Sequence, residues 1–257
     1  MTLNLKKHLN FVMLMTLSSM NFTQADNSQS SPDTQTSTFS GLYLGGALGL
    51  SQVNHKRDES FASNDTTVMN NKELSSSNSP GSKAPVASLF ATYYKRVSDN
   101  VVVGIEALSN LTSNRKKFDI YTYHDTEVTE NVYYQNIVTT KNYAALSLKS
   151  GMVINSNNLI FLKVGGSYKN YRVDSRYIVQ QSIKAPIFIS AGKNVFVPHI
   201  GFGIERQVKN YLFGFDVRYD FPKKINFSQF GAINSGTVNI NNKFSELTLS
   251  LRFSVKI

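Results

Sequence analysis

From residue 39 to the C-terminus, apolar and polar side chains alternate along segments of about a dozen residues, and a break follows each segment. Alternation with a period of two indicates β-strands, whose successive side chains point to opposite faces of a sheet. The sequence contains eight such segments: 39–51, 85–97, 101–112, 141–154, 159–171, 194–207, 211–221 and 243–257. Each is long enough for the ~9–11 residues with which a tilted strand crosses a membrane.

The breaks between these segments alternate in length. The long ones are 52–84, 113–140, 172–193 and 222–242, and the short ones are 98–100, 155–158 and 208–210. Each short break contains Asn, which suits tight turns. Short periplasmic turns on one rim and long external loops on the other are typical of an up-and-down membrane barrel. The sequence therefore predicts an all-β fold, an eight-stranded antiparallel up-and-down transmembrane β-barrel.

The two faces of the predicted strands differ in composition. In seven of the eight segments one face carries Leu, Val, Ile, Phe and Tyr without any charge. In segment 85–97 the orientation stays open, because Leu89 and Tyr93 alternate with Phe90 and Tyr94, which are equally apolar. A soluble lipocalin-like barrel would line its cavity with apolar side chains and wet its outside, so the pattern favours a barrel that faces lipid.

The opposite face carries glycines and ten charges, five acidic and five basic. The charged residues are Glu106, Glu205, Asp216, Asp220, Glu246, Lys149, Lys163, Lys169, Arg218 and Arg252. An Arg or Lys that faces the bilayer centre costs ~2–4 kcal/mol, and a lone buried charge is costly as well. An eight-stranded lumen is just wide enough for side chains to fill it. We therefore predict a paired charge network in the lumen, with glycines leaving room for the long side chains.

Short motifs along the chain resemble the eight-stranded OmpA-like outer-membrane β-barrel family. They are GLYLGGALGLS at 41–51, VGIE at 103–106, LKSG at 148–151 and PHIGFGIE at 198–205, and the resemblance extends over about residues 39–257. It implies that an interior network of acids and bases plugs or gates the lumen. The positions that match this network are Glu106, Lys149, Glu205 and Arg218.

The last strand is similar to the assembly signal of the same family. Its outward residues are Leu251, Phe253, Val255 and Ile257, where Ile257 replaces the usual terminal Phe. The resemblance implies the barrel-assembly machinery as a partner. It implies no peptidoglycan-binding role, because no globular domain follows the predicted barrel.

The first residues are typical of an export signal. Lys6 and Lys7 precede the apolar stretch 11–17, and Thr23-Gln24-Ala25 provides a cleavage site, so residues 1–25 are predicted to be a signal peptide. Residues 26–38 are polar and are predicted to form a disordered tail. Residues 39–257 then form the barrel domain, and the predicted location is the cell outer membrane.

Composition and charge narrow the chemistry. The chain has no Cys, which excludes a disulfide scaffold, a thiolate metal site and a cysteine nucleophile, and it has no Trp, so an interfacial girdle must use Tyr and Phe. An exported barrel protein explains the net charge of +10, so the charge does not call for nucleic acid as a partner. Loops 172–193 and 222–242 are basic, and their side chains can pair with the phosphates of lipopolysaccharide. We expect no cofactor and no metal.

The function is predicted to lie in the external loops. Tyr121, Tyr123, Tyr133 and Tyr134 give loop 113–140 a β-like composition, so its flanking strands are expected to project as a sheet. A projecting edge can add a strand from a host or environmental partner. We expect a monomeric surface protein that is not an enzyme.

Two alternatives stay open. One is a small gated pore, and the other is a lipid A-modifying enzyme that would use His199 with a Ser and an interior acid. Pro198, beside it, is expected to mark a bulge or a local bend, because proline lacks the N–H that a ladder needs.

Overall fold

The computed structural model describes residues 39–62, 78–112, 114–124, 131–179, 187–230 and 237–257. The predicted signal peptide and tail lie outside the described residues. The strands are β1 (Gly41–Ala62), β2 (Asn78–Arg96), β3 (Val101–Asn110), β4 (Asn114–His124), β5 (Asn131–Thr140), β6 (Tyr143–Ile154), β7 (Asn158–Val179), β8 (Ile187–Val208), β9 (Tyr211–Phe230) and β10 (Thr237–Lys256). Within this described part, no helix is long and apolar enough to cross a membrane.

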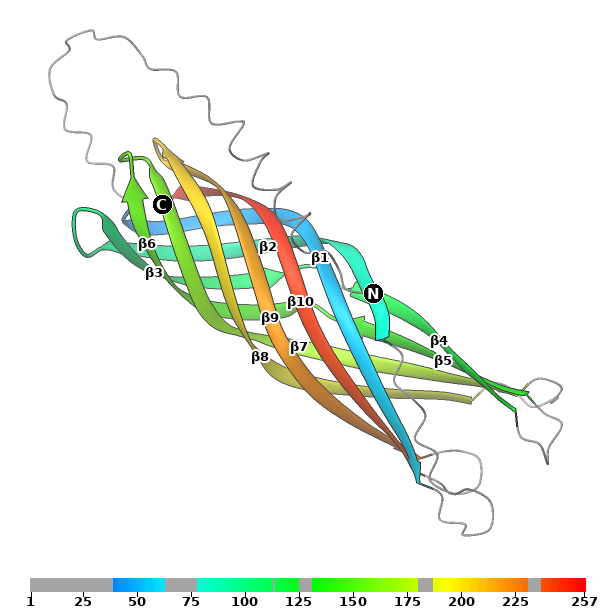
Figure 1. The fold of residues 1–257 in the computed structure, drawn as a ribbon. Coiled ribbons are helices and arrows are strands. Elements are labelled where there is room, and N and C mark those ends of the chain that lie inside the picture. Colours follow the sequence, from blue (N-terminus) through cyan, green and yellow to red (C-terminus); the bar gives the residue numbers. More distant parts are fainter. Residues whose placement is uncertain (1–38, 63–77, 113, 125–130, 180–186, 231–236) are drawn as a thin grey trace, which may run out of the picture. The chain divides into compact units, whose positions relative to one another are not determined.

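Eight of these strands close into a barrel (Figure 1). Each of β1, β2, β3, β6, β7, β8, β9 and β10 pairs antiparallel with the next, and β10 returns to pair with β1. The predicted up-and-down barrel is confirmed. Two of its short turns contain residues with positive φ, namely Asn155, Ser156 and Lys209, as tight hairpin turns require.

The two remaining strands continue barrel strands beyond an interruption. The β3–β6 ladder ends with Asn110 opposite Tyr143, and the β4–β5 ladder starts nearby with Asn114 opposite Thr140. In addition, β5 pairs with the outer part of β7, next to the place where β6 pairs with its inner part. The chain therefore builds two long strands, β3 with β4 and β5 with β6. The predicted projection of loop 113–140 as a sheet is confirmed.

The barrel opens into two leaves at its long-loop end. The β2–β3 pairing ends near Ala87, whose carbonyl accepts a hydrogen bond from the N–H of Leu111, and the β8–β9 pairing ends with His199 opposite Asp220. Beyond these points, β4, β5, β7 and β8 form one leaf, and β2, β1, β10 and β9 form the other. We call this part the extension. It comprises, within the described ranges, residues 52–62, 78–86, 112–142, 170–197 and 222–244.

Of the bulge or local bend expected at Pro198, the bulge is absent. The register between β7 and β8 continues without a shift through Pro198, which lies opposite Gly166. Pro198 instead lies next to His199, the residue at which the β8–β9 ladder ends. A residue without an N–H cannot donate to a ladder, so Pro198 suits the point where the two leaves separate.

The barrel wall presents apolar side chains outward. The open question about β2 is resolved, because Leu89 and Tyr93 are 56% and 50% exposed whereas Phe90 and Tyr94 are buried. We call the outward apolar surface the belt. It includes Leu42, Leu44, Leu48, Leu50, Leu89, Tyr93, Ile105, Leu146, Leu148, Ile160, Leu162, Val164, Tyr168, Phe196, Ile200, Phe202, Phe213, Phe221, Leu251 and Phe253. A continuous apolar surface of this kind is typical of a barrel that faces lipid.

The interior of the molecule contains two apolar clusters. The turn cluster, between the barrel strands at the short-turn end, consists of Phe39, Tyr43, Tyr94, Val102, Leu159, Phe161 and Leu212. The leaf cluster, between the two leaves of the extension, consists of Val53, Val138, Tyr171, Val173, Val195, Val197, Ile225 and Phe244. In it the rings of Tyr171 and Phe244 stack across the leaves with centroids 4.8 Å apart. The charged residues of the lumen lie between these two clusters along the strands.

Candidate functional site

Glu106 on β3 is the centre of the first group of lumen charges. Its carboxylate contacts the guanidinium of Arg252, whose Nη1 is 3.3 Å from Oε1, and two ammonium groups. Lys149 Nζ is 3.3 Å from Oε2, and Lys163 Nζ is 3.5 Å from Oε1. Thr92 donates a further hydrogen bond of 3.1 Å. Four other strands thus supply partners to this one buried carboxylate of β3.

Two more acids complete this group, which we call the first cluster. Lys149 Nζ is 3.0 Å from Glu205 Oε1, and Arg252 Nη1 is 2.7 Å from Asp216 Oδ2, which Lys163 also contacts. The first cluster therefore contains three acids and three bases and has no net charge. Buried charges are tolerated when they are paired in this way.

The second cluster consists of Lys169, Arg218, Asp220 and Glu246. Lys169 donates to both carboxylates, and Arg218 Nε is 3.2 Å from Asp220 Oδ1. Arg218 also donates to the hydroxyl of Tyr143. This cluster has two acids and two bases, so each cluster is neutral by itself.

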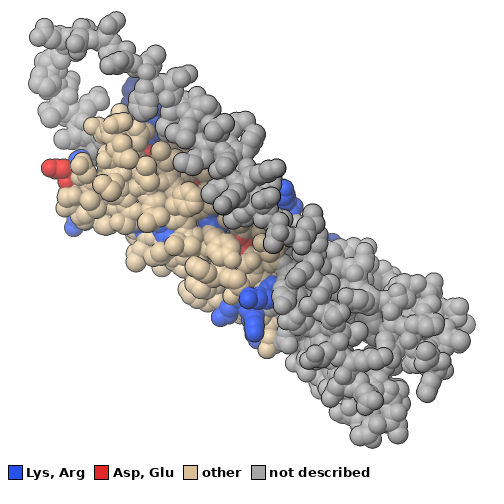
Figure 2. Space-filling model, in the orientation of Figure 1, with Lys and Arg blue, Asp and Glu red and all other residues tan. Residues whose placement is uncertain are grey.

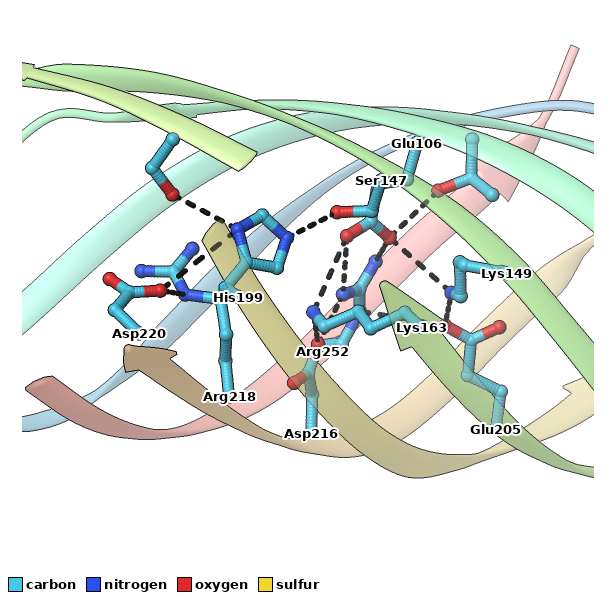
Figure 3. Close-up of polar contacts among 12 residues, drawn as sticks. Glu106, Ser147, Lys149, Lys163, His199, Glu205, Asp216, Arg218, Asp220 and Arg252 are labelled. Atoms are coloured by element: carbon cyan, nitrogen blue, oxygen red, sulfur yellow. Dashed lines mark hydrogen bonds and ion pairs between the residues drawn. The ribbon is translucent and has the colours of Figure 1, made fainter. Parts of the chain in front are cut away.

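His199 lies between the two clusters (Figure 3). Its Nε2 is 2.8 Å from Ser147 Oγ, and its Nδ1 is 3.2 Å from Ser167 Oγ and 4.0 Å from Asp220 Oδ1. In a hydrolytic triad the acid accepts a hydrogen bond from Nδ1 and the nucleophile is open to substrate. Here the Nδ1–Asp220 separation is beyond hydrogen-bond range, and His199, Asp220 and both serines are buried.

Glycines provide the space that the long side chains occupy. A Cβ added to Gly201 would lie 2.7 Å from Cε of Lys163, and one added to Gly165 would lie 2.9 Å from Nε2 of His199. Both separations are shorter than a normal van der Waals contact. The network therefore depends on the missing side chains at these two inward positions.

The lumen charges are closed off at both ends. None of the ten is more than 6% exposed, and the turn cluster and the leaf cluster flank them. At the short-turn end of the charge network, Lys149 Nζ lies 3.9 Å from the centroid of the Phe161 ring, which belongs to the turn cluster. Among the residues that the structure describes, apolar side chains therefore cover the charges at both ends of the lumen. Within the described residues, no group of His, Asp and Glu could hold a metal ion.

The structure places the sequence-predicted residues as follows. All ten inward charges reach the lumen. Leu251, Phe253 and Val255 point outward on β10, and Ile257, which follows the end of β10, is exposed. Tyr121 and Tyr123 lie on β4 and Tyr133 and Tyr134 on β5, with side chains outside the described set.

Sequence reasoning missed the polar partners of the network. Tyr94 donates a hydrogen bond of 2.6 Å to Glu205 Oε2, and Tyr143 accepts one from Arg218. Ser51 donates to Glu246. The alternation in segment 85–97 could have identified Tyr94. If Leu89 faces outward, the period of two places Tyr94 inward.

A ring of basic side chains follows the long-loop edge of the belt, and we call it the basic collar. Its members are all exposed: Lys83, Arg115, Lys141, Arg172, Lys193, Lys223, Lys224 and Lys243. Figure 2 shows a broad tan surface along the barrel, with a group of Lys and Arg atoms where that surface ends toward the extension. The prediction of basic loops covered only 172–193 and 222–242, whereas the collar also includes Lys83 of β2, Arg115 of β4, Lys141 between β5 and β6, and Lys243 of β10.

One acid lies within the collar among the described side chains. Arg172 Nε is 2.8 Å from Asp174 Oδ1. Partial burial acts to raise the pKa of the Asp174 carboxyl, but hydrogen bonds from Ser190 and Arg172, and the charges of Arg172 and Arg115, hold that pKa below its usual range. Asp174 therefore stays ionised and partly neutralises this side of the collar.

No protein-family model matches the sequence, and no characterised protein matches it at the level of sequence. Several solved barrels are similar in fold. Ail of Yersinia pestis, solved with the heparin analogue sucrose octasulfate, is 11% identical with a TM-score of 0.35 over 82% of this chain and 99% of its own. The outer membrane protein OprG from Pseudomonas aeruginosa is 11% identical with a TM-score of 0.45, over 85% and 97%. The outer membrane protein AlkL is 15% identical with a TM-score of 0.39, over 91% and 97%. Values this low carry no argument about function.

Proposed function

We propose that this chain is an outer-membrane surface protein of the small OmpA-like barrel type, in which the barrel is the anchor and the extension is displayed outside the cell. The observation that carries the proposal is the reversal of polarity along the strands. In the belt the outside is apolar and the interior charged. In the extension most of the described interior side chains are apolar, and most of the described outward side chains are polar, with Phe196 an exception that borders the belt. A lipid layer around the belt and water around the extension satisfy both parts.

The closed lumen favours an anchor over a pore. Ten charges are paired into two neutral clusters, and apolar clusters close both ends. Conduction would require breaking buried ion pairs, which costs several kcal/mol for each lost partner. The network thus acts as the core of the barrel.

The extension offers an edge for a partner. β4 is the terminal strand of the sheet, and within the described residues it pairs with β5 alone. Its backbone from Asn114 to His124 therefore has one side open to strand addition by an extended segment of a host or environmental protein. Adhesion through this edge is the binding function that we assign to the displayed part.

Protease shaving of intact cells tests the display. A protease site inserted between Asp125 and Glu130 should be cleaved on whole cells, and the same site inserted at Ser156 in a short turn should be cut only after the cells are opened. The opposite pattern would reverse the orientation and overturn the proposal.

Adherence tests the partner function separately. Cells that express a chain lacking residues 118–136 should adhere to an epithelial monolayer no better than cells with an empty vector, while the barrel keeps its heat-modifiable electrophoretic mobility. Adherence equal to that of the full chain would contradict the role of the β4 edge.

A further inference from the structure

Lys169 of the second cluster lies between two buried carboxylates. Its Nζ donates to Oδ2 of Asp220 and to Oε2 of Glu246, and none of these three side chains is more than 8% exposed. The ring of Tyr143 lies against the same nitrogen, which is 4.4 Å from the ring centroid. An amine that touches two carboxyl groups away from water has an acyl carbon to attack and a proton carrier beside it.

The two carboxylates differ in their other contacts, and the difference assigns them different roles. The second oxygen of Asp220, Oδ1, lies 3.2 Å from Nε of Arg218. A cation at this place stabilises the negative charge that the oxygen gains when the carbon beside it is attacked. Oε1 of Glu246 instead accepts a hydrogen bond from Ser51, so its Oε2 stays directed at Lys169. Asp220 is therefore the acyl group, and Glu246 is the proton carrier.

The leaf cluster covers this group of side chains. Tyr171 is the next inward residue of β7 after Lys169, Phe244 is the inward residue of β10 before Glu246, and the two rings stack on each other. Condensation of an amine with a carboxyl group releases water, so a site that excludes water favours the amide. Groups held in contact also react as if at effective concentrations of ~10⁵–10⁸ M. The amide replaces two buried charges by a neutral group and so removes their desolvation cost.

We propose that Lys169 and Asp220 condense to an intramolecular isopeptide bond once the barrel has folded. Glu246 takes a proton from Nζ of Lys169, and the freed electron pair attacks Cγ of Asp220. A C–N bond forms, and the bond between Cγ and Oδ2 breaks. Of the three protons of the ammonium group, two pass by way of Glu246 to Oδ2, which leaves as water, and the third stays on the amide nitrogen. Glu246 and Arg218 end in the state in which they began, and no other reactant takes part.

The bond lies where the two leaves separate. Lys169 is on β7 and Asp220 is on β9, the two neighbours of β8, and Asp220 forms the last rung of the β8–β9 ladder with His199. Beyond this rung, the described parts of β8 and β9 belong to different leaves. The isopeptide bond joins the leaves covalently where hydrogen bonding between these two strands ends. It belongs to the folded chain and does not depend on the partner that the extension binds.

The first cluster contains a similar lysine in different surroundings. Lys163 contacts Oδ2 of Asp216 and lies 3.5 Å from Glu106. There Arg252 holds the same Oδ2 and also Glu106, so the oxygen that would leave is fixed and the second acid is not free to carry protons. Oδ1 of Asp216 has no hydrogen-bond partner among the described residues. We therefore expect no bond at Lys163, which makes it the matched control.

Mass spectrometry of the intact, denatured chain tests the bond. After refolding from urea into detergent micelles, the wild-type chain should be lighter by one water, whereas the same chain kept in urea should have its full mass. Lys169→Arg keeps the positive charge, but its guanidinium stays protonated and is no nucleophile, so this variant should keep its full mass after refolding. Lys163→Arg makes the same change in the first cluster and should lose the water as the wild type does.

A tryptic digest locates the bond and a further variant tests the proton carrier. Residues 164–172, which contain Lys169, should be joined to residues 219–223, which contain Asp220. Glu246→Gln should slow the loss of water on the order of 100-fold, with heat-modifiable mobility showing that the barrel has folded.

Three results would count against the bond. A full mass for the folded wild-type chain would overturn the proposal outright. A loss of water that persists in Lys169→Arg, or that disappears in Lys163→Arg alone, would place the dehydration at another residue and overturn it as well. An unchanged rate in folded Glu246→Gln would overturn the role of Glu246 as proton carrier. The whole-cell shaving that tests the display does not depend on any of these results.

Discussion

The belt and the extension use the same strands with opposite polarity, and β7 shows the change within one strand. From Leu159 to Lys169, the inward side chains of β7 include members of the turn cluster and of the charge network, and its outward side chains are apolar. Past this point, Tyr171 and Val173 are buried in the leaf cluster while Arg172 is exposed. The alternation of faces is unbroken, but the residue types on the two faces exchange. The two faces of β7 thus exchange polarity where the strand passes from the belt into the extension.

The two regions also differ in how they close. In the belt every strand has two partners, so the sheet has no edge. In the extension the ladders stop at Ala87 and at His199, and the two leaves are held together by the side chains between them. Closure by hydrogen bonds suits a lipid environment, in which an unpaired edge is costly. In water, edges are permitted, and one of them is available to a partner.

The largest effect is expected where the belt depends on paired interior charges. Glu106→Ala leaves Arg252, Lys149 and Lys163 without their shared carboxylate, and loss of one side of a buried pair costs about 3–5 kcal/mol. Guanidinium unfolding from phospholipid vesicles measures this. Thr92→Val, which removes one hydrogen bond to the same carboxylate, should cost about 1 kcal/mol. Equal losses in the two variants would show that the network does not stabilise the belt.

The sequence predicted the belt well and the extension poorly, for the same physical reason. Segment 211–221 ends where outward apolar residues stop, yet β9 continues to Phe230, and segment 159–171 likewise falls short of Val179. An outward apolar face marks a strand in the sequence, and most of the described outward side chains of the extension are polar. The ten lumen charges were found because they alternate with lipid-facing residues, whereas their pairing and the collar depend on registers between distant strands.

The outer faces of the two regions should respond differently to a new charge. Leu148 points outward in the belt and is 62% exposed, so Leu148→Arg should cost about 2–4 kcal/mol in vesicles. Asn226→Arg, at an exposed position of the extension, should change stability by less than about 0.5 kcal/mol. The same vesicle unfolding assay compares both. A large cost at Asn226 would place the extension in lipid.

A smaller difference in stability is expected between shortening an apolar side chain in the leaf cluster and shortening one on the belt. Ile225 is 1% exposed within the leaf cluster, so Ile225→Val leaves a cavity and should cost about 0.5–1.5 kcal/mol. Ile160→Val shortens a side chain on the belt, where lipid can fill the gap, and should cost less. Limited proteolysis should detect faster cleavage of the extension in Ile225→Val with the belt intact. Equal cleavage in both variants would mean that the leaf cluster is not a packed core.

The smallest effect concerns the one described acid of the collar. Because the pKa of Asp174 is held below its usual range, its pairing stabilises the extension above the unfolded pKa and is lost as the pH falls through the folded pKa. The pair is partly exposed, so Asp174→Asn should change stability by less than about 1 kcal/mol. The wild type should lose this contribution to its melting temperature as the pH falls below about 4, and the variant should not.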